Sequence, residues 1–199
     1  MIHQHLSSRL AAACGGVFAV LLFAAAGDGG YAPVREVLAM VALGLAIPFV
    51  WQVGRVLGSA ATESAGLAGA AVSAGVAGIV LKMASGAPDV AIHEAGLRSG
   101  TPTYDALTQL AEATTVVSLV PLAVFCGIAA ALALGSGVLP RWLAVGAGVT
   151  AVALVVNSTA VGASFVPAIL LFQLWTVITS VHLVRAGSSR RAEVAVAAH

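Results

Sequence analysis

Histidines 93 and 182 are the residues of this chain whose type and spacing come nearest to a catalytic or metal site. His93 and Glu94 begin a pair found in zinc proteases, where a second histidine follows one helical turn later and both imidazoles bind the metal. Position 97 is a leucine, so no zinc site follows. His182 can approach His3 and His5 at one membrane surface, which makes only a weak metal constellation.

A serine nucleophile with a histidine base is the other chemistry to test. Ser164 precedes His182 by 18 residues on the same predicted helix. At 1.5 Å per residue this is roughly 27 Å, so the two cannot form a dyad. The sequence therefore predicts no enzyme, no cofactor and no metal site.

Gln173 and Trp175 lie near the centre of a long apolar stretch. An amide at mid-membrane depth needs a partner because lipid offers none, so we expect a polar contact at these two residues. Pro48 and Pro121 lie well inside two other apolar stretches, and each removes a backbone donor, so we expect a kink at each. Kinked helices can open a mid-membrane cavity, although a proline in a membrane helix commonly has a purely structural role.

The composition indicates the kind of secondary structure in which these residues lie. Charged residues make up 9% of the chain and hydrophobic residues 60%, with a mean hydropathy of +1.03. A soluble chain carries about 25% charged residues. The few charges are separated by continuous apolar stretches near the roughly 20 residues that cross a bilayer, and the absence of alternation excludes β-barrel strands. We therefore predict an all-α polytopic transmembrane helix bundle in a single domain, residues 1–199. The predicted spans are about 10–27, 36–56, 63–83, 110–135, 139–159 and 165–185.

The distribution of Lys and Arg predicts the orientation of the six spans, because cytoplasmic loops carry the excess. With the N-terminus in the cytoplasm, that side holds six of the nine basic residues. These six are Arg9, Arg55, Arg141, Arg185, Arg190 and Arg191, and the other three are Arg35, Lys82 and Arg98. We expect both termini in the cytoplasm of a bacterium and the protein in its inner (cell) membrane.

The first apolar run leaves one alternative open. Arg9, the run 10–23 and the small residues 24–26 could also form a cleavable secretory signal, which would leave five spans. The run is at the upper length limit for such a signal, and its loss would spoil the charge balance, so we expect the first span to be retained.

The outer loop 84–109 is the only polar region of any size. It is typical of a short helix from Pro88, a break at 99–101 and a second helix that continues into the fourth span. The loop is either a lid over an external cavity or an ordinary solvated connection, and we favour the connection.

Small residues recur along the third span every four positions, at Gly66, Ala70, Ala74 and Gly78. Such rows let helix backbones approach closely, so we expect them to pack against neighbouring helices. A second row runs beside the first, at Gly69, Ser73 and Ala77. On the second span, Trp51 and Arg55 are four residues apart, so the guanidinium can extend past the indole toward the cytoplasm.

The segment 137–143, GVLPRWL, and the residues from Phe172 to Arg185 resemble uncharacterised six-helix multi-pass membrane proteins common in high-GC bacteria. The resemblance covers roughly the C-terminal half of the chain. It implies an inner-membrane protein with no assigned activity, and it transfers no functional residue.

Two functions remain from the sequence. The first is a non-enzymatic helix-bundle module that lies in the lipid bilayer and binds a membrane partner or forms a homo-oligomer. The second is a small-molecule or lipid carrier, with Gln173 and Trp175 facing a mid-membrane cavity shaped by Pro48 and Pro121. We prefer the first, because small-residue rows are plentiful and buried polar groups are few. No basic stripe for binding nucleic acid is present.

Overall fold

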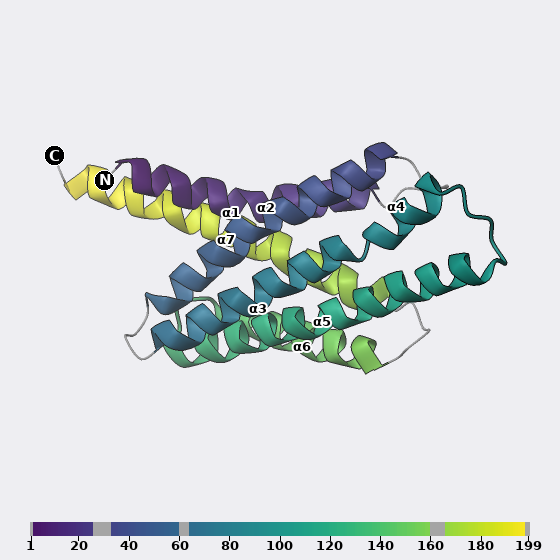
Figure 1. Ribbon diagram of the computed structural model, residues 1–199. Coiled ribbons are helices and arrows are strands. Elements are labelled where there is room, and N and C mark those ends of the chain that lie inside the picture. Colours follow the sequence, from purple (N-terminus) through teal and green to yellow (C-terminus); the bar gives the residue numbers. More distant parts are fainter. Residues whose placement is uncertain (1, 26–32, 60–63, 160–165, 198–199) are drawn as a thin grey trace.

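The computed structural model describes residues 2–25, 33–59, 64–159 and 166–197 (Figure 1). All regular structure in these ranges is helical. The helices are α1 (Ile2–Ala25), α2 (Pro33–Gly58), α3 (Ser64–Ala84), α4 (Ala87–Glu94), α5 (Pro102–Ser136), α6 (Arg141–Thr159) and α7 (Val166–Ala197).

Within the described residues, five helical segments are long and apolar enough to cross a membrane. They are Val34–Gly58, Ala65–Glu94, Pro102–Ser136, Arg141–Thr159 and Pro167–Ala186, of which the second joins α3 to α4. The apolar part of α1, Arg9–Ala25, is shorter. The predicted all-helical class is thus confirmed, and five of the six predicted spans have helices of membrane-spanning length and composition, while the first stays a prediction.

Proline sets the starts of α4 and α5, and glycine sets the end of α5. α5 begins at Pro102, and its N-cap Thr101 accepts a hydrogen bond from the backbone N–H of Tyr104. α5 ends before Gly137, whose φ of 66° is the left-handed conformation that glycine adopts at low cost. The short helix expected from Pro88 is present as α4. The predicted span 110–135 lies in the C-terminal part of α5, which has 35 residues.

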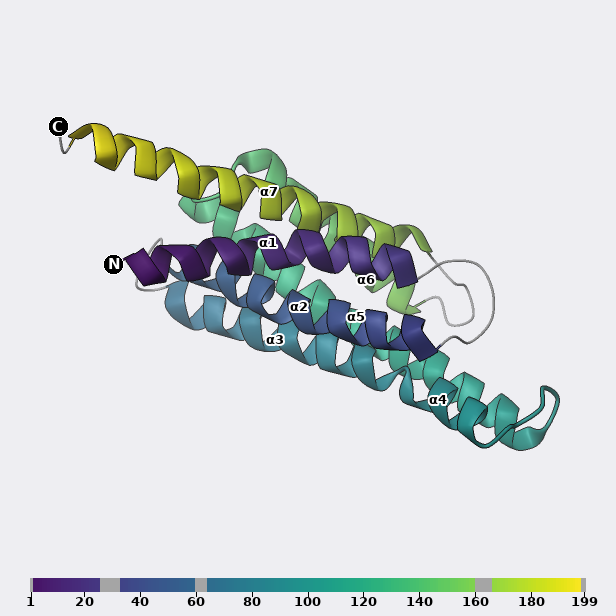
Figure 2. The same ribbon diagram turned by 90° about the horizontal axis from the view of Figure 1, so that it is seen from above.

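The six long helices form a ring in the order α1, α2, α3, α5, α6 and α7, and α7 closes the ring on α1 (Figures 1 and 2). The short helix α4 packs on α5. The start of α1 and the end of α7 lie at one end of the bundle, here named the terminal end, and α4 lies at the opposite end, named the α4 end (Figure 1).

Large apolar side chains cover the outside of the ring as well as its interior. Exposed examples on successive helices are Val20, Val41, Val80, Val124, Val152 and Leu174. A water-soluble protein rarely leaves so much contiguous apolar surface uncovered, whereas lipid solvates it. The outer surface is thus typical of a protein surrounded by acyl chains.

Pro48 and Pro121 lie inside α2 and α5, and both helices continue on either side of the proline. Near the terminal end of α2, the guanidinium carbon of Arg55 lies 4.9 Å from the ring centroid of Trp51. This geometry is a cation–π contact, and it matches the predicted course of the arginine past the indole.

Candidate functional site: the aromatic core and its buried polar side chains

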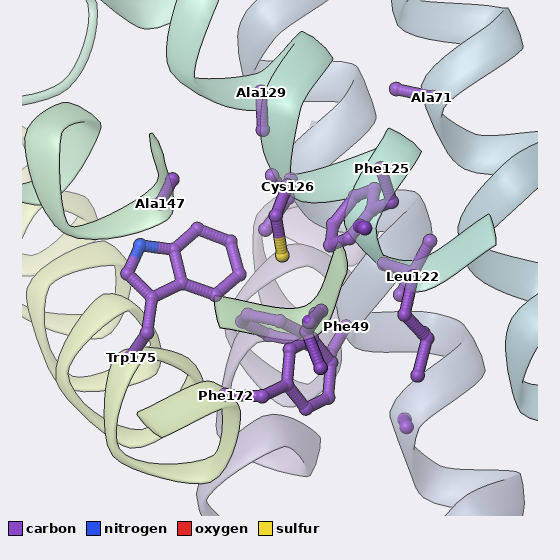
Figure 3. Packing of buried hydrophobic residues seen from close by; sticks show 14 of the residues in the cluster. Phe49, Ala71, Leu122, Phe125, Cys126, Ala129, Ala147, Phe172 and Trp175 are labelled. Atoms are coloured by element: carbon purple, nitrogen blue, oxygen red, sulfur yellow. The ribbon is translucent and has the colours of Figure 1, made fainter. Parts of the chain in front are cut away.

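Four aromatic rings from three helices fill the centre of the bundle (Figure 3). The Trp175 ring centroid lies 6.2 Å from that of Phe49, 6.0 Å from that of Phe125 and 6.4 Å from that of Phe172. The contacts with Phe49 and Phe125 are edge-to-face, an arrangement that the ring quadrupoles favour. We name these four residues the aromatic core. On its edge, Phe18 of α1 packs against Phe172 at 6.4 Å.

Trp175 also has a polar contact at mid-bundle. Its indole Nε1 donates a hydrogen bond of 3.1 Å to the backbone carbonyl of Leu143 on α6. α6 approaches closely here, since a Cβ on Gly146 would lie 3.4 Å from Trp175 Cδ1. Trp175 is therefore buried and hydrogen-bonded. Gln173 is only half-buried and lies outside the buried core, so the two residues singled out together in the sequence are separated.

On the terminal side of the aromatic core, α7 buries three further polar residues, Thr176, Thr179 and Ser180. Ser180 Oγ donates to the carbonyl of Thr176 at 2.7 Å. The hydroxyl oxygens of Thr176 and Thr179 have no hydrogen-bond partner in the part of the chain that the structure describes, and the same holds for Oε1 of Gln52 on α2. None of these polar residues was singled out from the sequence. Helical spacing could have indicated the two threonines, because each follows an aromatic core residue by four positions and therefore lies on the same face of α7.

The small residues of α3 divide between two faces. Gly78 is buried against α5, where a Cβ would lie 2.6 Å from Leu122 Cγ and 3.1 Å from the Leu122 backbone nitrogen. Ala74 is half-buried, and Gly66 and Ala70 are exposed. Gly75, which belongs to neither predicted row, lies close to both α2 and α5, since a Cβ there would lie 2.7 Å from Val50 Cγ1 and 3.2 Å from Phe125 Cγ. The residues that α3 buries are Ala68, Ala71, Gly75, Gly78 and Ile79.

A second polar cluster joins four helices at the α4 end. Lys82 Nζ on α3 donates a 3.0 Å hydrogen bond to Thr115 Oγ1 on α5. The carboxylates of Asp89 on α4 and Glu36 on α2 are close enough to act on the lysine charge. Glu36 Oε2 would lie 3.4 Å from a Cβ on Gly86, so α2 approaches the turn before α4. From the sequence, Lys82 counted only toward the distribution of basic residues, and nothing marked it as a contact between helices.

The remaining candidates stay apart. His93 and Glu94 are exposed on α4, and His182 is half-buried on α7. The side chains of His3 and His5, and all of Ser164, lie outside the described residues. Among the described side chains, no group of three or more His, Cys, Asp or Glu could hold a metal ion.

Cys14 is half-buried and Cys126 is fully buried beside the aromatic core, and both are free thiols (Figure 3). Cys126 is therefore a small apolar residue in a packed interior, because a thiol needs a polar, accessible setting to react. What the site offers chemically is an apolar, aromatic centre with neutral hydroxyl and amide groups on one side.

Known proteins give no further guide to the site. No protein-family model matches this chain, and no curated protein or solved structure is significantly similar to it. The resemblance noted from the sequence therefore stays an expectation, and the function has to be argued from the geometry.

Proposed function

We propose that this chain is a six-span protein of a bacterial inner membrane, with both termini in the cytoplasm, and that it acts as a non-enzymatic module that associates with another membrane helix. The sixth span in this proposal is α1, which has 24 residues and is thus about 36 Å long at 1.5 Å per residue. α1 packs along both α2 and α7, and Phe18 reaches the aromatic core. Because α1 lies between α7 and α2 and closes the ring of helices, its removal would open the bundle. This favours retention of α1 over cleavage.

The charge distribution supports the orientation. Arg9, Arg55, Arg141 and Arg185 lie at or toward the terminal end of their helices, whereas Arg35 and Lys82 lie toward the α4 end. The terminal end is therefore the more basic end of the bundle, and the positive-inside rule places it in the cytoplasm.

The observation that carries the association is the outward face of α3. Five small residues are exposed there, namely Gly66, Gly69, Ala70, Ser73 and Ala77. A Cβ added at Gly66 or Gly69 would meet no atom of the described residues within 4 Å, so both positions are open to the outside of the bundle. In lipid, a face of this kind lets a second helix approach to backbone contact, whereas bulky valines are frequent on the exposed faces of α5 and α6.

The carrier hypothesis receives less support. It requires a cavity that Gln173 and Trp175 line together. Trp175 instead lies in a close-packed aromatic core with its indole nitrogen bonded to Leu143, and Gln173 lies outside that core. A close-packed interior of this kind is more typical of a static helix bundle than of a carrier that moves solutes.

A photo-crosslinking experiment tests the association. The photo-reactive amino acid p-benzoylphenylalanine is incorporated at Ser73 by suppression of a stop codon, so that no thiol has to react inside the lipid, and native membranes are irradiated. We expect a discrete adduct, whose mass distinguishes a second copy from another protein. The matched control carries the same amino acid at Val124, which also faces outward but on α5, and should give no discrete adduct.

A packing variant completes the test. Ala70→Ile should abolish the Ser73 adduct, because a branched side chain blocks close helix approach. Ala131→Ile, at an exposed small residue on α5, should leave it unchanged. If the photo-reactive group at Ser73 gives no discrete adduct, or if Ala70→Ile leaves the adduct unchanged, α3 is not an association face.

A further inference from the structure

Three side-chain oxygens on the terminal side of the aromatic core are buried without a hydrogen-bond partner among the described residues. They are Oε1 of Gln52 and the hydroxyl oxygens of Thr176 and Thr179. Gln52 is 8% exposed and both threonines are 0% exposed. Buried polar groups are nearly always bonded, so three in one region point to an additional hydrogen-bonding species.

The position of these residues in the bundle follows from the contact between α2 and α7. Both helices run from the α4 end to the terminal end (Figure 1), and they meet where Phe49 packs on Trp175. Gln52 follows Phe49 by three residues and Thr179 follows Trp175 by four, rises of about 4.5 and 6 Å in the same direction. Gln52 and Thr179 therefore lie at similar depth on the terminal side of the aromatic rings, and Thr176 lies about 4.5 Å nearer to the rings on the same helix.

α1 brings the same two helices together at this level. A Cβ on Gly15 would lie 2.5 Å from Phe49 Cδ2 on α2, and it would also collide with Ser180 Oγ on α7. The three helices therefore enclose the region on one side, while the aromatic core covers it toward the α4 end.

Other buried hydroxyl groups of this protein are hydrogen-bonded, so burial alone does not explain why Thr176 and Thr179 lack a partner. Thr150 on α6 is equally buried, and its hydroxyl donates to the carbonyl of Gly146 at 2.8 Å. Ser180 likewise donates to the carbonyl one turn earlier in its own helix. Thr176 and Thr179 make no such bond to their own backbone, so their hydroxyl groups remain available to a ligand.

The chemistry of the three groups selects the ligand. An amide oxygen only accepts, whereas each threonine hydroxyl both donates and accepts. One water molecule can donate to Gln52 Oε1 and to one threonine oxygen and can accept from the other hydroxyl, which gives the three bonds typical of a buried water. No charged side chain belongs to the set, which disfavours an ion in so apolar a setting.

We propose that Gln52, Thr176 and Thr179 form an internal water site that bridges α2 and α7 beneath the aromatic core. α2 and α7 share little direct backbone contact, since each packs mainly on α1 and on its other neighbour in the ring. The bound water therefore supplies a polar link between the two helices at the level where the aromatic contacts end.

Water-edited solid-state NMR of the wild-type protein in lipid bilayers tests the site without any mutation. Magnetisation should pass from water to the side chains of Thr176 and Thr179 several-fold faster than to that of Thr150, which is buried to the same extent but is bonded to its own helix. Equal and slow transfer to all three threonines would overturn the proposal.

Isosteric variants give a second readout. Thr179→Val should slow the transfer of magnetisation from water to Thr176 and Gln52, because the three residues share one ligand, and it should lower the thermal unfolding midpoint. If the hydroxyl is simply unpaired, Thr179→Val should leave the transfer unchanged and raise the midpoint, since valine removes a buried polar group without changing the shape. That second result would contradict the water site.

Discussion

The indole nitrogen of Trp175 donates a hydrogen bond to the backbone carbonyl of Leu143, and this bond joins α7 to α6. α6 and α7 have the least extensive contact of any neighbouring pair in the ring, and this hydrogen bond is one of the links between them. The same ring is edge-to-face with Phe49 and Phe125. Trp175 is thus the residue through which α7 is held against three other helices.

Trp175→Phe should destabilise the bundle by about 1–3 kcal/mol, because it removes the bond to Leu143 and leaves a small cavity. The measurement is unfolding of the purified protein in detergent. Trp142→Phe is the control, since Trp142 is exposed, and it should change the free energy of unfolding by less than about 0.5 kcal/mol. Equal effects of the two substitutions would mean that Trp175 does not hold α7 to its neighbours.

Gly78→Ala should destabilise the protein by about 1–3 kcal/mol, because the added Cβ would lie 2.6 Å from Leu122 Cγ and 3.1 Å from the Leu122 backbone nitrogen. Gly69→Ala has no atom within 4 Å of its new Cβ and should instead stabilise by about 0.5–1 kcal/mol, through the higher helix propensity of alanine. Unfolding in detergent measures both. Changes of the same sign would show that α3 and α5 are not in close contact at Gly78.

Lys82→Met should loosen α4 from the bundle. The substitution removes the hydrogen bond to Thr115 and leaves Glu36 and Asp89 without their nearby positive charge, at a cost of about 1.5–3 kcal/mol. Limited proteolysis of the segment 84–101 in proteoliposomes should become faster. Arg98→Met, at an exposed position in the same segment, should leave the cleavage rate unchanged. An unchanged rate in Lys82→Met would mean that the lysine does not hold α4.

The six-span orientation predicts the behaviour of fused reporters. Alkaline phosphatase fused after His199 should be inactive and green fluorescent protein there should be fluorescent, because the positive-inside rule places that end in the cytoplasm. Phosphatase inserted at Gly100 should be active. The intact mass of the purified protein should include Met1 if α1 is retained. An active phosphatase after His199 would contradict the orientation, and a mass lacking the first 25 or so residues would contradict retention.

The local elements of this chain were predictable because each has a local physical cause. Apolar length predicted the long helices, Pro88 and Pro102 fit the starts of α4 and α5, and a spacing of four residues predicted the contact between Trp51 and Arg55. These features depend on residues within a turn or two of one another. The sequence therefore sufficed for the helical class and for the break between α4 and α5.

The faces of the helices were not predictable in the same way. In a soluble helix the polar stripe marks the outside, but here both lipid and the protein interior are apolar, so helical periodicity carries little information about which face is buried. The row from Gly66 to Gly78 looked like one packing surface, yet Gly66 is exposed and Gly78 contacts Leu122. Only the packing of α3 between α2 and α5 separates the two.

By itself, the sequence determined that this protein is a bundle of apolar helices with a polar connection near one end, because chain length, charge spacing and proline act locally. The tertiary structure alone decided that Trp175 is buried while Gln173 is half-buried, that Lys82 donates to Thr115 of another helix, and that Gln52 lies at the depth of Thr179. Each of these facts depends on the rotation and depth of one helix relative to another. The rotation and depth of the helices are set by the packing of many side chains at once, so they cannot be deduced from any short stretch of sequence.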